Sequence, residues 1–223
     1  MEFQFQKSKK NYPLTTGMTI ALLVSHVILN FLPHEIVTTY FFSYPGEFNF
    51  INWILSTFAH ASVGHLLWNS LFLYVLGRAV EEKVGAGQWI LFYIMAGLLS
   101  GFGDSLIRGV LLSQTQPTVG ASGAISGLAV VAALRSPYTI PIGGKLIPFP
   151  VFFIAWVMIY SDLTNLFTRD NIARWSHLGG YLSVFLAAYF LDEKQRKELK
   201  IGFFLNVVFF ILSLILLFFI GNR

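Results

Sequence analysis

The chain has 223 residues, of which 55% are hydrophobic and 12% are charged, and it contains no cysteine, so disulfides are excluded. Soluble domains carry about twice this charged fraction, and the mean hydropathy of +0.66 indicates an integral membrane protein. The net charge of +4 is modest, and no basic patch is interleaved with aromatic residues, which argues against a nucleic-acid partner.

The N-terminal part of the chain predicts a cytosolic segment, one membrane span and a long loop. Residues 1–13 are polar and contain three lysines. The apolar run 14–32 is long enough to cross a membrane, exceeds a signal-peptide core and is followed by no small-residue cleavage site, so we interpret it as the first transmembrane helix. Residues 33–64 are rich in aromatics, lack Lys and Arg, and are broken by Pro45. They predict an interfacial, partly embedded loop.

The remaining apolar stretches predict a helical bundle. Further spans are expected at 65–84, 87–107, 119–134, 146–167 and 175–191, separated by loops at 105–118, 137–145 and 168–174. A charged inner linker at 192–200 leads to a strongly apolar seventh span within 201–223. We therefore expect an all-α membrane protein with a six-helix core over 14–191 and one additional C-terminal transmembrane helix.

The distribution of basic residues orients these spans. With the N-terminus inside, 11 of the 15 Lys and Arg residues fall on inner segments. The inner ones are Lys7, Lys9, Lys10, Arg78, Lys83, Arg135, Lys145, Lys194, Arg196, Lys197 and Lys200. Because positive residues concentrate on the cytoplasmic side, we expect a multi-pass protein of the cell membrane with its N-terminus cytoplasmic and its C-terminus outside.

The fourth span opens with a polar, glycine-rich stretch around Ser122. Gly120 and Gly123 leave the backbone bare on both sides of Ser122, in the first helical turn, where N–H groups lack intrahelical partners. Those donors and the helix dipole favour negative charge, so a serine there can act as a nucleophile whose developing oxyanion meets ready donors. The alternative is a packing face of small residues, since Gly123 and Gly127 form a G-x-x-x-G pair.

Other polar residues are expected at the same depth. The second, fourth and sixth spans all run inward, so their first turns lie near the outer face and carry His65 with Asn69, Ser122, and His177. Polar groups in membrane segments are costly and indicate function. Small residues in the fourth and sixth spans allow close approach of the two helices. We therefore expect the Ser122 hydroxyl within hydrogen-bond reach of His177, as proton transfer to a base requires.

At this point the chain resembles the rhomboid family of intramembrane serine proteases, over spans one to six. Each matching piece alone is weak, whereas their combined order and spacing is specific. The pieces are His60-Ala-Ser-Val-Gly-His65-Leu-Leu-Trp-Asn69, Leu76-Gly77-Arg78-Ala79-Val80-Glu81, Gly120-Ala-Ser122-Gly123 and His177-Leu-Gly-Gly180.

The resemblance implies a rhomboid-like polytopic helical bundle and assigns roles to these residues. Ser122 would be the nucleophile and His177 the general base, as a pair without a third, acidic member. The side chains of His65 and Asn69, with the Ser122 backbone N–H, would form the oxyanion hole. Supporting positions would be Gly120, Gly123, His60 and Gly180, of which we interpret His60 as a structural hydrogen-bonding residue. Such enzymes cleave transmembrane segments of other membrane proteins near their outer ends, within membrane lipid.

The chain departs from the family pattern at some positions. Family members commonly have an aromatic residue one turn after the nucleophile, packed on the catalytic histidine, and this chain has Ser126 there. His177 is then held less firmly, or another group holds it. Asp104 and Asp162 lie near the outer ends of the third and fifth spans. Either is a candidate for a third member that orients His177, but interfacial carboxylates are ordinary, and we favour that interpretation for both.

Three alternatives were weighed against a protease, and no metal or cofactor is expected. An inactive rhomboid-like protein that binds transmembrane helices would be marked by loss of Ser122 or His177, and both are present. A transporter would predict repeated halves with polar sites at the midplane, and no repeat is visible. A zinc site of His60, His65 and His177 lacks a His-Glu-x-x-His motif and leaves Ser122 unused. The sequence does not define the oligomeric state.

Overall fold

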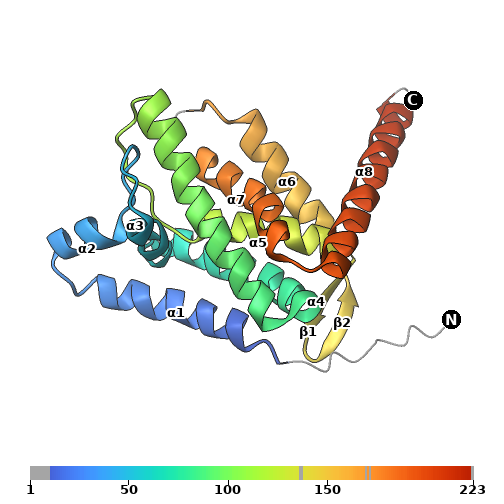
Figure 1. Ribbon diagram of the computed structural model, residues 1–223, viewed down its shortest axis with the longest axis horizontal. Coiled ribbons are helices and arrows are strands. Elements are labelled where there is room, and N and C mark those ends of the chain that lie inside the picture. Colours follow the sequence, from blue (N-terminus) through green and yellow to red (C-terminus); the bar gives the residue numbers. More distant parts are fainter. Residues whose placement is uncertain (1–10, 136–137, 169, 171, 222–223) are drawn as a thin grey trace.

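The structure, a computed structural model, describes residues 11–135, 138–168, 170 and 172–221, with the side chains of the last helix described as far as residue 215. These residues form a helical bundle with one small hairpin (Figure 1). In chain order the principal elements are α1 (Pro13–Leu29), α2 (His34–Phe41), α3 (Phe50–Leu55), α4 (Val63–Asp104), α5 (Ser122–Arg135), β1 (Thr139–Ile142), β2 (Lys145–Pro148), α6 (Val151–Thr164), α7 (Arg174–Ala187) and α8 (Glu193–Gly221). The predicted all-α fold class is confirmed.

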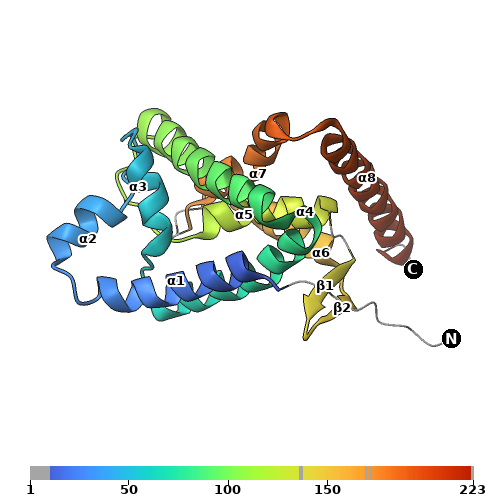
Figure 2. The ribbon, with the colours of Figure 1, turned by 60° about the horizontal axis from the view of Figure 1, so that its bottom comes forward.

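Helix α5 lies at the centre of the bundle, between α4 and α7 (Figures 1 and 2). Most of its residues are buried, and its inner faces carry glycine where neighbouring helices come closest. A Cβ placed on Gly127 would lie 2.4 Å from the Ala96 Cβ of α4, and one on Gly180 of α7 would lie 2.1 Å from the Gly123 carbonyl oxygen. The helices therefore approach at distances that only small residues permit, as predicted for membrane packing.

Helix α4 combines the predicted second and third spans. The helix breaks at Gly85, where the backbone has φ of +77°, a conformation that glycine adopts without strain. The first half packs beside α1, and the second half turns back across α5 (Figure 2). The second half then continues as a π-helical segment, Ser105–Leu111, so the predicted loop at 105–118 is partly helical.

The long loop at 33–64 is more ordered than its composition suggests. It contains α2, α3 and a 3-10 turn, Ser56–Phe58. Asn49 caps α3 by accepting from the backbone N–H groups of Ile51 and Asn52, which explains why a short helix begins there. The Asn52 side chain donates to the Thr39 and Phe42 carbonyls and ties α3 to α2.

Most of the predicted turn-rich loop at 137–145, whose first residue lies outside the described part of the chain, is instead part of an antiparallel hairpin over residues 139–148. Strands β1 and β2 pair in the register Thr139 with Pro148 and Ile142 with Lys145. Gly143 and Gly144 both have positive φ, the backbone that a tight hairpin turn requires. Helix α6 consequently begins at Val151, later than the predicted residue 146, after Pro150.

Helix α8 begins earlier than predicted. The charged segment 192–200 is expected to be a linker, but the chain is helical from Glu193. The reason is a reciprocal cap, in which the Gln195 N–H donates to the Asp192 carboxylate and the Asp192 N–H donates to Gln195 Oε1. The start of α8 contacts α5, and the rest of the helix projects away from the bundle (Figures 1 and 2).

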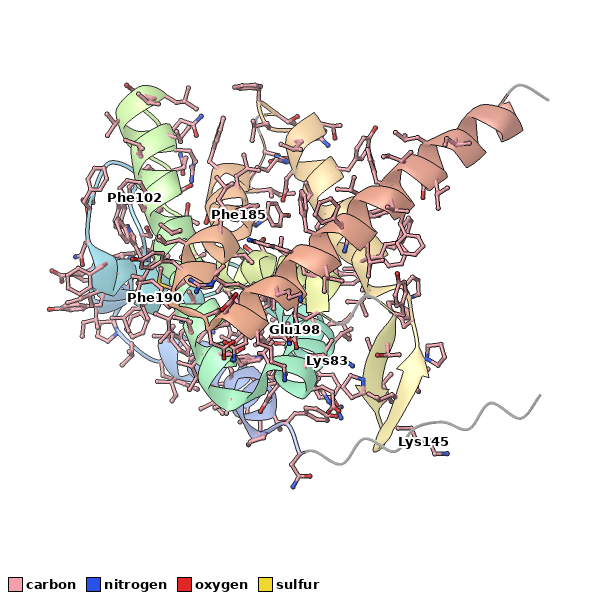
Figure 3. All side chains as sticks on the ribbon, turned by 45° about the vertical axis from the view of Figure 1, so that its right-hand side comes forward. Lys83, Phe102, Lys145, Phe185, Phe190 and Glu198 are labelled. Atoms are coloured by element: carbon pink, nitrogen blue, oxygen red, sulfur yellow. The ribbon has the colours of Figure 1, made fainter. Side chains whose placement is uncertain are left out.

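The apolar helices and charged groups agree with a membrane-embedded bundle. By length and composition, two described helices can cross a membrane, Val63–Leu111 and Glu193–Ile215, and three shorter apolar helices accompany them, Pro13–Leu29, Ser122–Arg135 and Val151–Thr164. Lys83, Lys145 and Glu198 lie toward one end of the molecule, and Glu198 pairs with Arg135 at the last turn of α5 (Figure 3). Ser122, at the first turn of α5, is at the opposite end of that helix.

Candidate active site

Ser122 and His177 are in direct contact. Ser122 is the first residue of α5, and His177 lies in the first turn of α7. The distance between Ser122 Oγ and His177 Nε2 is 2.9 Å, a normal hydrogen bond between a hydroxyl and an imidazole nitrogen. Both residues are half-buried. The two helices thus bring together residues 55 positions apart in the sequence.

The glycines predicted as supporting positions make this contact possible. A Cβ on Gly123 would lie 1.7 Å from Ser100 Oγ of α4, so any larger residue would displace α5 from its neighbour. Gly180 lies directly against the Gly123 carbonyl, which sets the separation of α5 and α7. Behind Gly123, the hydroxyls of Ser100 and Ser176 share a buried hydrogen bond between α4 and α7. The first turns of α5 and α7 are therefore fixed by close backbone packing.

Gly120 has a role of its own in the approach to Ser122. Its φ of +113° lies in the region that favours glycine, and its N–H donates to the Ser56 carbonyl at 2.9 Å. A Cβ at this position would lie 2.6 Å from His65 Cε1. The absence of a side chain therefore permits the turn into α5 and leaves room for the His65 ring beside it.

The second ring nitrogen of His177 is in hydrogen-bond contact with Asp162, an arrangement that the sequence interpretation considered but did not favour. His177 Nδ1 lies 3.0 Å from Asp162 Oδ2, and the Tyr181 hydroxyl donates to the same oxygen at 2.6 Å. Asp162 is only 6% exposed. The interpretation of Asp162 as an ordinary interfacial carboxylate is wrong, because α6 turns this side chain inward toward α7. A lone carboxylate in an apolar span was the only signal for it in the sequence.

Ser126, which stands where the family commonly has an aromatic residue, does not orient His177 by ring packing. Its hydroxyl donates to the Ser122 carbonyl at 2.8 Å, and the residue is fully buried. The Tyr181 hydroxyl lies beside it. Of the two expectations for His177, the second therefore holds: another group, Asp162, binds its free nitrogen.

His65 and Asn69 lie on one face of α4, and the His65 ring is close to the turn that precedes Ser122. The His65 ring contacts Gly120, and Asn69 Nδ2 donates to the His65 carbonyl at 2.8 Å. Asn69 is buried, and its Oδ1 has no hydrogen-bond partner among the described residues. The structure thus brings His65 to the segment that leads into Ser122, and it places Asn69 one helical turn beyond His65.

His60 is held by aromatic rings rather than by hydrogen bonds. Its ring lies edge-on to His65 at 5.2 Å between centroids and edge-on to His26 at 6.5 Å. Among the described residues, neither ring nitrogen has a hydrogen-bond partner of normal geometry. Burial, reinforced by His65 and His26, lowers the pKa of His60 to about 4, although the Phe58 backbone opposes this shift.

Asp104 is the other carboxylate near the outer ends of the helices, and its partners differ from those of Asp162. It is 1% exposed and accepts from Arg108 and from the Thr118 hydroxyl. These contacts tie the segment before Ser122 to the end of α4. Its interpretation as an ordinary interfacial carboxylate is therefore also wrong, because this buried group organises a loop.

Ser122 and His177 are hydrogen-bonded to each other at the starts of two packed helices inside an apolar bundle. This arrangement defines a candidate serine hydrolase of the membrane. The family model described as the Rhomboid domain matches residues 47–194. The chain therefore belongs to the rhomboid family, whose members are integral membrane proteins and include intramembrane serine proteases. The family and fold predicted from the sequence are confirmed.

Curated relatives agree with this assignment at modest identity. The chain is 25% identical over 191 residues to "Rhomboid protease GlpG" of Serratia proteamaculans, covering 82% of this chain and 64% of that protein. It is 31% identical over 134 residues to "Rhomboid protease GluP" of Bacillus subtilis, covering 58% and 24%. It is 36% identical over 93 residues to "Rhomboid-like protein 11, chloroplastic" of Arabidopsis thaliana, covering 41% and 30%. The chain thus spans less than two thirds of each of these relatives.

Proposed function

We propose that this protein is an intramembrane serine endopeptidase that cleaves transmembrane segments of other membrane proteins near their outer ends. The observation that carries the proposal is the 2.9 Å contact between Ser122 Oγ and His177 Nε2 at the start of two buried, closely packed helices. A serine hydroxyl is a weak nucleophile until a base within hydrogen-bond reach can take its proton.

The proposed reaction has two halves. In the first, His177 Nε2 accepts the Ser122 proton while Oγ bonds to the carbonyl carbon of the scissile peptide. The tetrahedral intermediate then collapses, the carbon–nitrogen bond breaks, and the histidine returns the proton to the leaving amine. In the second half, a water molecule gives a proton to His177 as its oxygen bonds to the acyl carbon. The bond between that carbon and Ser122 Oγ then breaks, His177 returns the proton to Oγ, and the carboxylic acid leaves.

The oxyanion is proposed to be stabilised by the Ser122 backbone N–H, His65 and Asn69. Ser122 begins α5, so its N–H belongs to the turn whose donors lack intrahelical acceptors. The His65 ring lies against Gly120, and Asn69 Nδ2 keeps a second hydrogen beyond the one given to the His65 carbonyl. Donors in place before the reaction stabilise the developing charge without reorganisation.

The proposed orientation of the protein in the membrane, and its proposed substrates, follow from the positions of the two ends of α5. The Arg135 end of α5, with Lys83, Lys145 and Glu198 nearby in Figure 3, is proposed to face the cytoplasm. The Ser122 end then faces the outer side, where water can reach the site. The substrates are transmembrane helices that approach through the lipid, and the protein is proposed to reside in the cell membrane.

Cleavage of a transmembrane reporter by the purified protein tests this proposal. The wild type, Ser122→Ala and His177→Ala are compared with Ser213→Ala, an exposed serine of α8 that bonds only within its own helix. We expect cleavage by the wild type and the Ser213 variant, and loss of at least about 10⁴-fold in the other two, because the pair acts as a unit. Full cleavage by folded Ser122→Ala would overturn the assignment. No cleavage by any of the proteins, with the reporter bound, would favour an inactive helix-binding member.

A further inference from the structure

We propose that Asp162 is a positioning residue that, with Tyr181, holds His177 in the orientation and protonation form needed by Ser122, so that this protein works with a Ser122–His177–Asp162 triad. The inference rests on the proposed function. It assigns the third group that the two-residue site leaves open.

Two hydrogen bonds link side chains from three helices. Asp162 on α6 contacts His177 on α7 at 3.0 Å, and His177 contacts Ser122 on α5 at 2.9 Å. The two contacts use the two different nitrogens of one ring. Each step is a hydrogen bond of normal length, and the carboxylate is separated from the serine by the imidazole, as the base of an acyl-transfer site requires.

The carboxylate has the partners that burial demands. Its Oδ2 accepts from both His177 and the Tyr181 hydroxyl, and its Oδ1 lies 4.0 Å from Arg174 Nε. Arg174 is itself buried and is held by Asp170 through two hydrogen bonds. A buried carboxylate is costly unless donors and an opposite charge surround it, and here they do. Asp162 is therefore held by two hydrogen bonds, with the Arg174 guanidinium on its other side.

The contact fixes which nitrogen of His177 carries the proton. Asp162 Oδ2 already accepts a hydrogen bond from Tyr181, and a carboxylate has no hydrogen to donate. It therefore also accepts from the ring, which means that Nδ1 is the nitrogen that carries the proton. The lone pair then lies on Nε2 and faces the Ser122 hydroxyl. When Nε2 takes the serine proton, the ring becomes cationic next to Asp162, which stabilises that charge.

The network also explains how the chain manages without an aromatic side chain at position 126. Ser126 is small and bonds to its own helix. Tyr181 lies one turn after His177 on α7, with its hydroxyl next to Ser126 and bonded to Asp162. The ring of Tyr181 is buried, so an aromatic residue occupies this region from α7 rather than from α5. His177 is thus oriented by a hydrogen-bonded anchor.

The charges around His177 decide how its protonation responds to substitution. Asp162 of α6 bonds to the ring, and Arg174 lies on the same helix. From α4, His65 and the Asp104 carboxylate, which is paired with Arg108, lie within electrostatic range. Asp162 is the only one of these groups in hydrogen-bond contact with His177. Removing its charge takes away the group that stabilises the cationic ring during the reaction, so the pH profile of kcat/KM should change, whereas damage to packing alone should not move that profile.

The test is the pH dependence of kcat/KM for the reporter, measured for wild type, Asp162→Asn, Asp162→Glu and Tyr181→Phe. The control is Glu81→Gln. Glu81 is also a buried carboxylate that accepts hydrogen bonds, from Thr15 and Leu14, but it lies in the first half of α4, away from His177. Thermal unfolding in detergent establishes that each variant is folded.

For Asp162→Asn we expect a fall in kcat of about 10²–10⁴-fold with little change in KM, and an acid limb moved to lower pH. Asp162→Glu should recover part of the rate because it keeps the charge. Tyr181→Phe also keeps the charge, so it should lower kcat about tenfold without moving the limb to lower pH. Glu81→Gln should leave the limb in place even if it lowers stability.

Two results would overturn the triad. One is a folded Asp162→Asn enzyme with wild-type kcat and an unmoved acid limb. The other is equal uniform loss in Asp162→Asn and Asp162→Glu with no movement of the limb, which a merely structural carboxylate predicts. If Asp162→Asn does not fold, Asp162→Glu and Tyr181→Phe decide the matter. Both outcomes leave cleavage by the wild type and its loss in Ser122→Ala intact, so they are distinct from failure of the proposed function.

Discussion

Helices α5 and α8 are both apolar, yet they lie at opposite extremes of the bundle. In α5, eight of the 14 residues are Gly, Ala or Ser, and most of the helix is buried. In α8, Phe, Leu and Ile dominate, and most described side chains are exposed. In lipid, burying large apolar side chains gives little advantage, so the helices that pack closely are those with small residues. Residue size, more than hydropathy, separates the helices at the centre of the bundle from those at its periphery.

The same contrast holds for polar groups. At the centre, Ser122, His177 and Asp162 satisfy one another across three helices. At the edge, α8 makes fewer polar contacts with the bundle: Asn206, near the middle of the helix, donates to the Ala133 carbonyl and accepts from Trp156. Central polar groups therefore fix the site, whereas peripheral ones attach a helix to a bundle that is already packed.

The largest effect in this comparison should come from a methyl group added at the centre. Gly180→Ala places a Cβ 2.1 Å from the Gly123 carbonyl oxygen, so α5 and α7 must separate. We expect a loss of about 1–3 kcal/mol in stability and near-complete loss of activity, since the Ser122–His177 contact depends on that spacing. Thermal unfolding in detergent and the cleavage assay measure both.

Gly17→Ala is the matched peripheral change. Gly17 is exposed in α1, and a Cβ there meets nothing within 4 Å. The variant should be unchanged in activity and gain up to about 1 kcal/mol, because alanine favours a helix over glycine. Equal damage from both substitutions would remove the distinction between centre and edge.

A smaller effect is expected at Asn69. Asn69→Ala removes one proposed oxyanion donor, which typically contributes about 3 kcal/mol to the transition state, or roughly 10²-fold in kcat. The residue is buried, so unfolding must be measured beside turnover. A variant with wild-type kcat would remove Asn69 from the oxyanion hole, and a loss confined to stability would make it a packing residue.

The smallest effect concerns His60, which lies at the border between α1 and α4 through its ring contacts with His26 and His65. Its pKa is about 4 in the folded protein, below the ordinary 6.5, chiefly because of burial. Unfolding therefore takes up a proton between these values, so stability is full above pH 6.5 and falls as the pH decreases toward 4. His60→Asn should show a flatter decline over this range. If the free energy of unfolding falls equally steeply with decreasing pH in the wild type and in His60→Asn, a group other than His60 causes the decline.

The sequence predicted the family, the order of the main apolar helices and the Ser122–His177 contact because these depend on local signals. Glycines beside Ser122 and in the first turns of the sixth span indicate close helix packing. The polar residues at the starts of the second, fourth and sixth spans are predicted to lie at the same depth in the membrane. The hairpin at 139–148 and the early start of α8 had signals as well, in Gly143-Gly144 and in the Asp192–Gln195 cap. Polar and turn-forming residues between apolar stretches are also typical of loops, so these signals do not by themselves distinguish a hairpin or a helix start from a loop.

Asp162 could not be predicted in the same way. A carboxylate near the end of a span has the same sequence whether it points to water or into the bundle. Its direction depends on the rotation of α6 about its axis, which is set by contacts with α5 and α7 far away in the chain. Tyr181 lies on α7, two helices after Ser122 along the chain. No local motif marks it as the residue that donates a hydrogen bond to Asp162.

The most direct test of the account is the site of covalent modification by a fluorophosphonate. The protein is labelled in detergent, digested and mapped by mass spectrometry, with His177→Ala as the control. The account predicts one adduct, on Ser122, that is absent from the His177 variant, because only a serine paired with a base is activated. An adduct on another serine, or reporter cleavage that persists when Ser122 is fully modified, would contradict it.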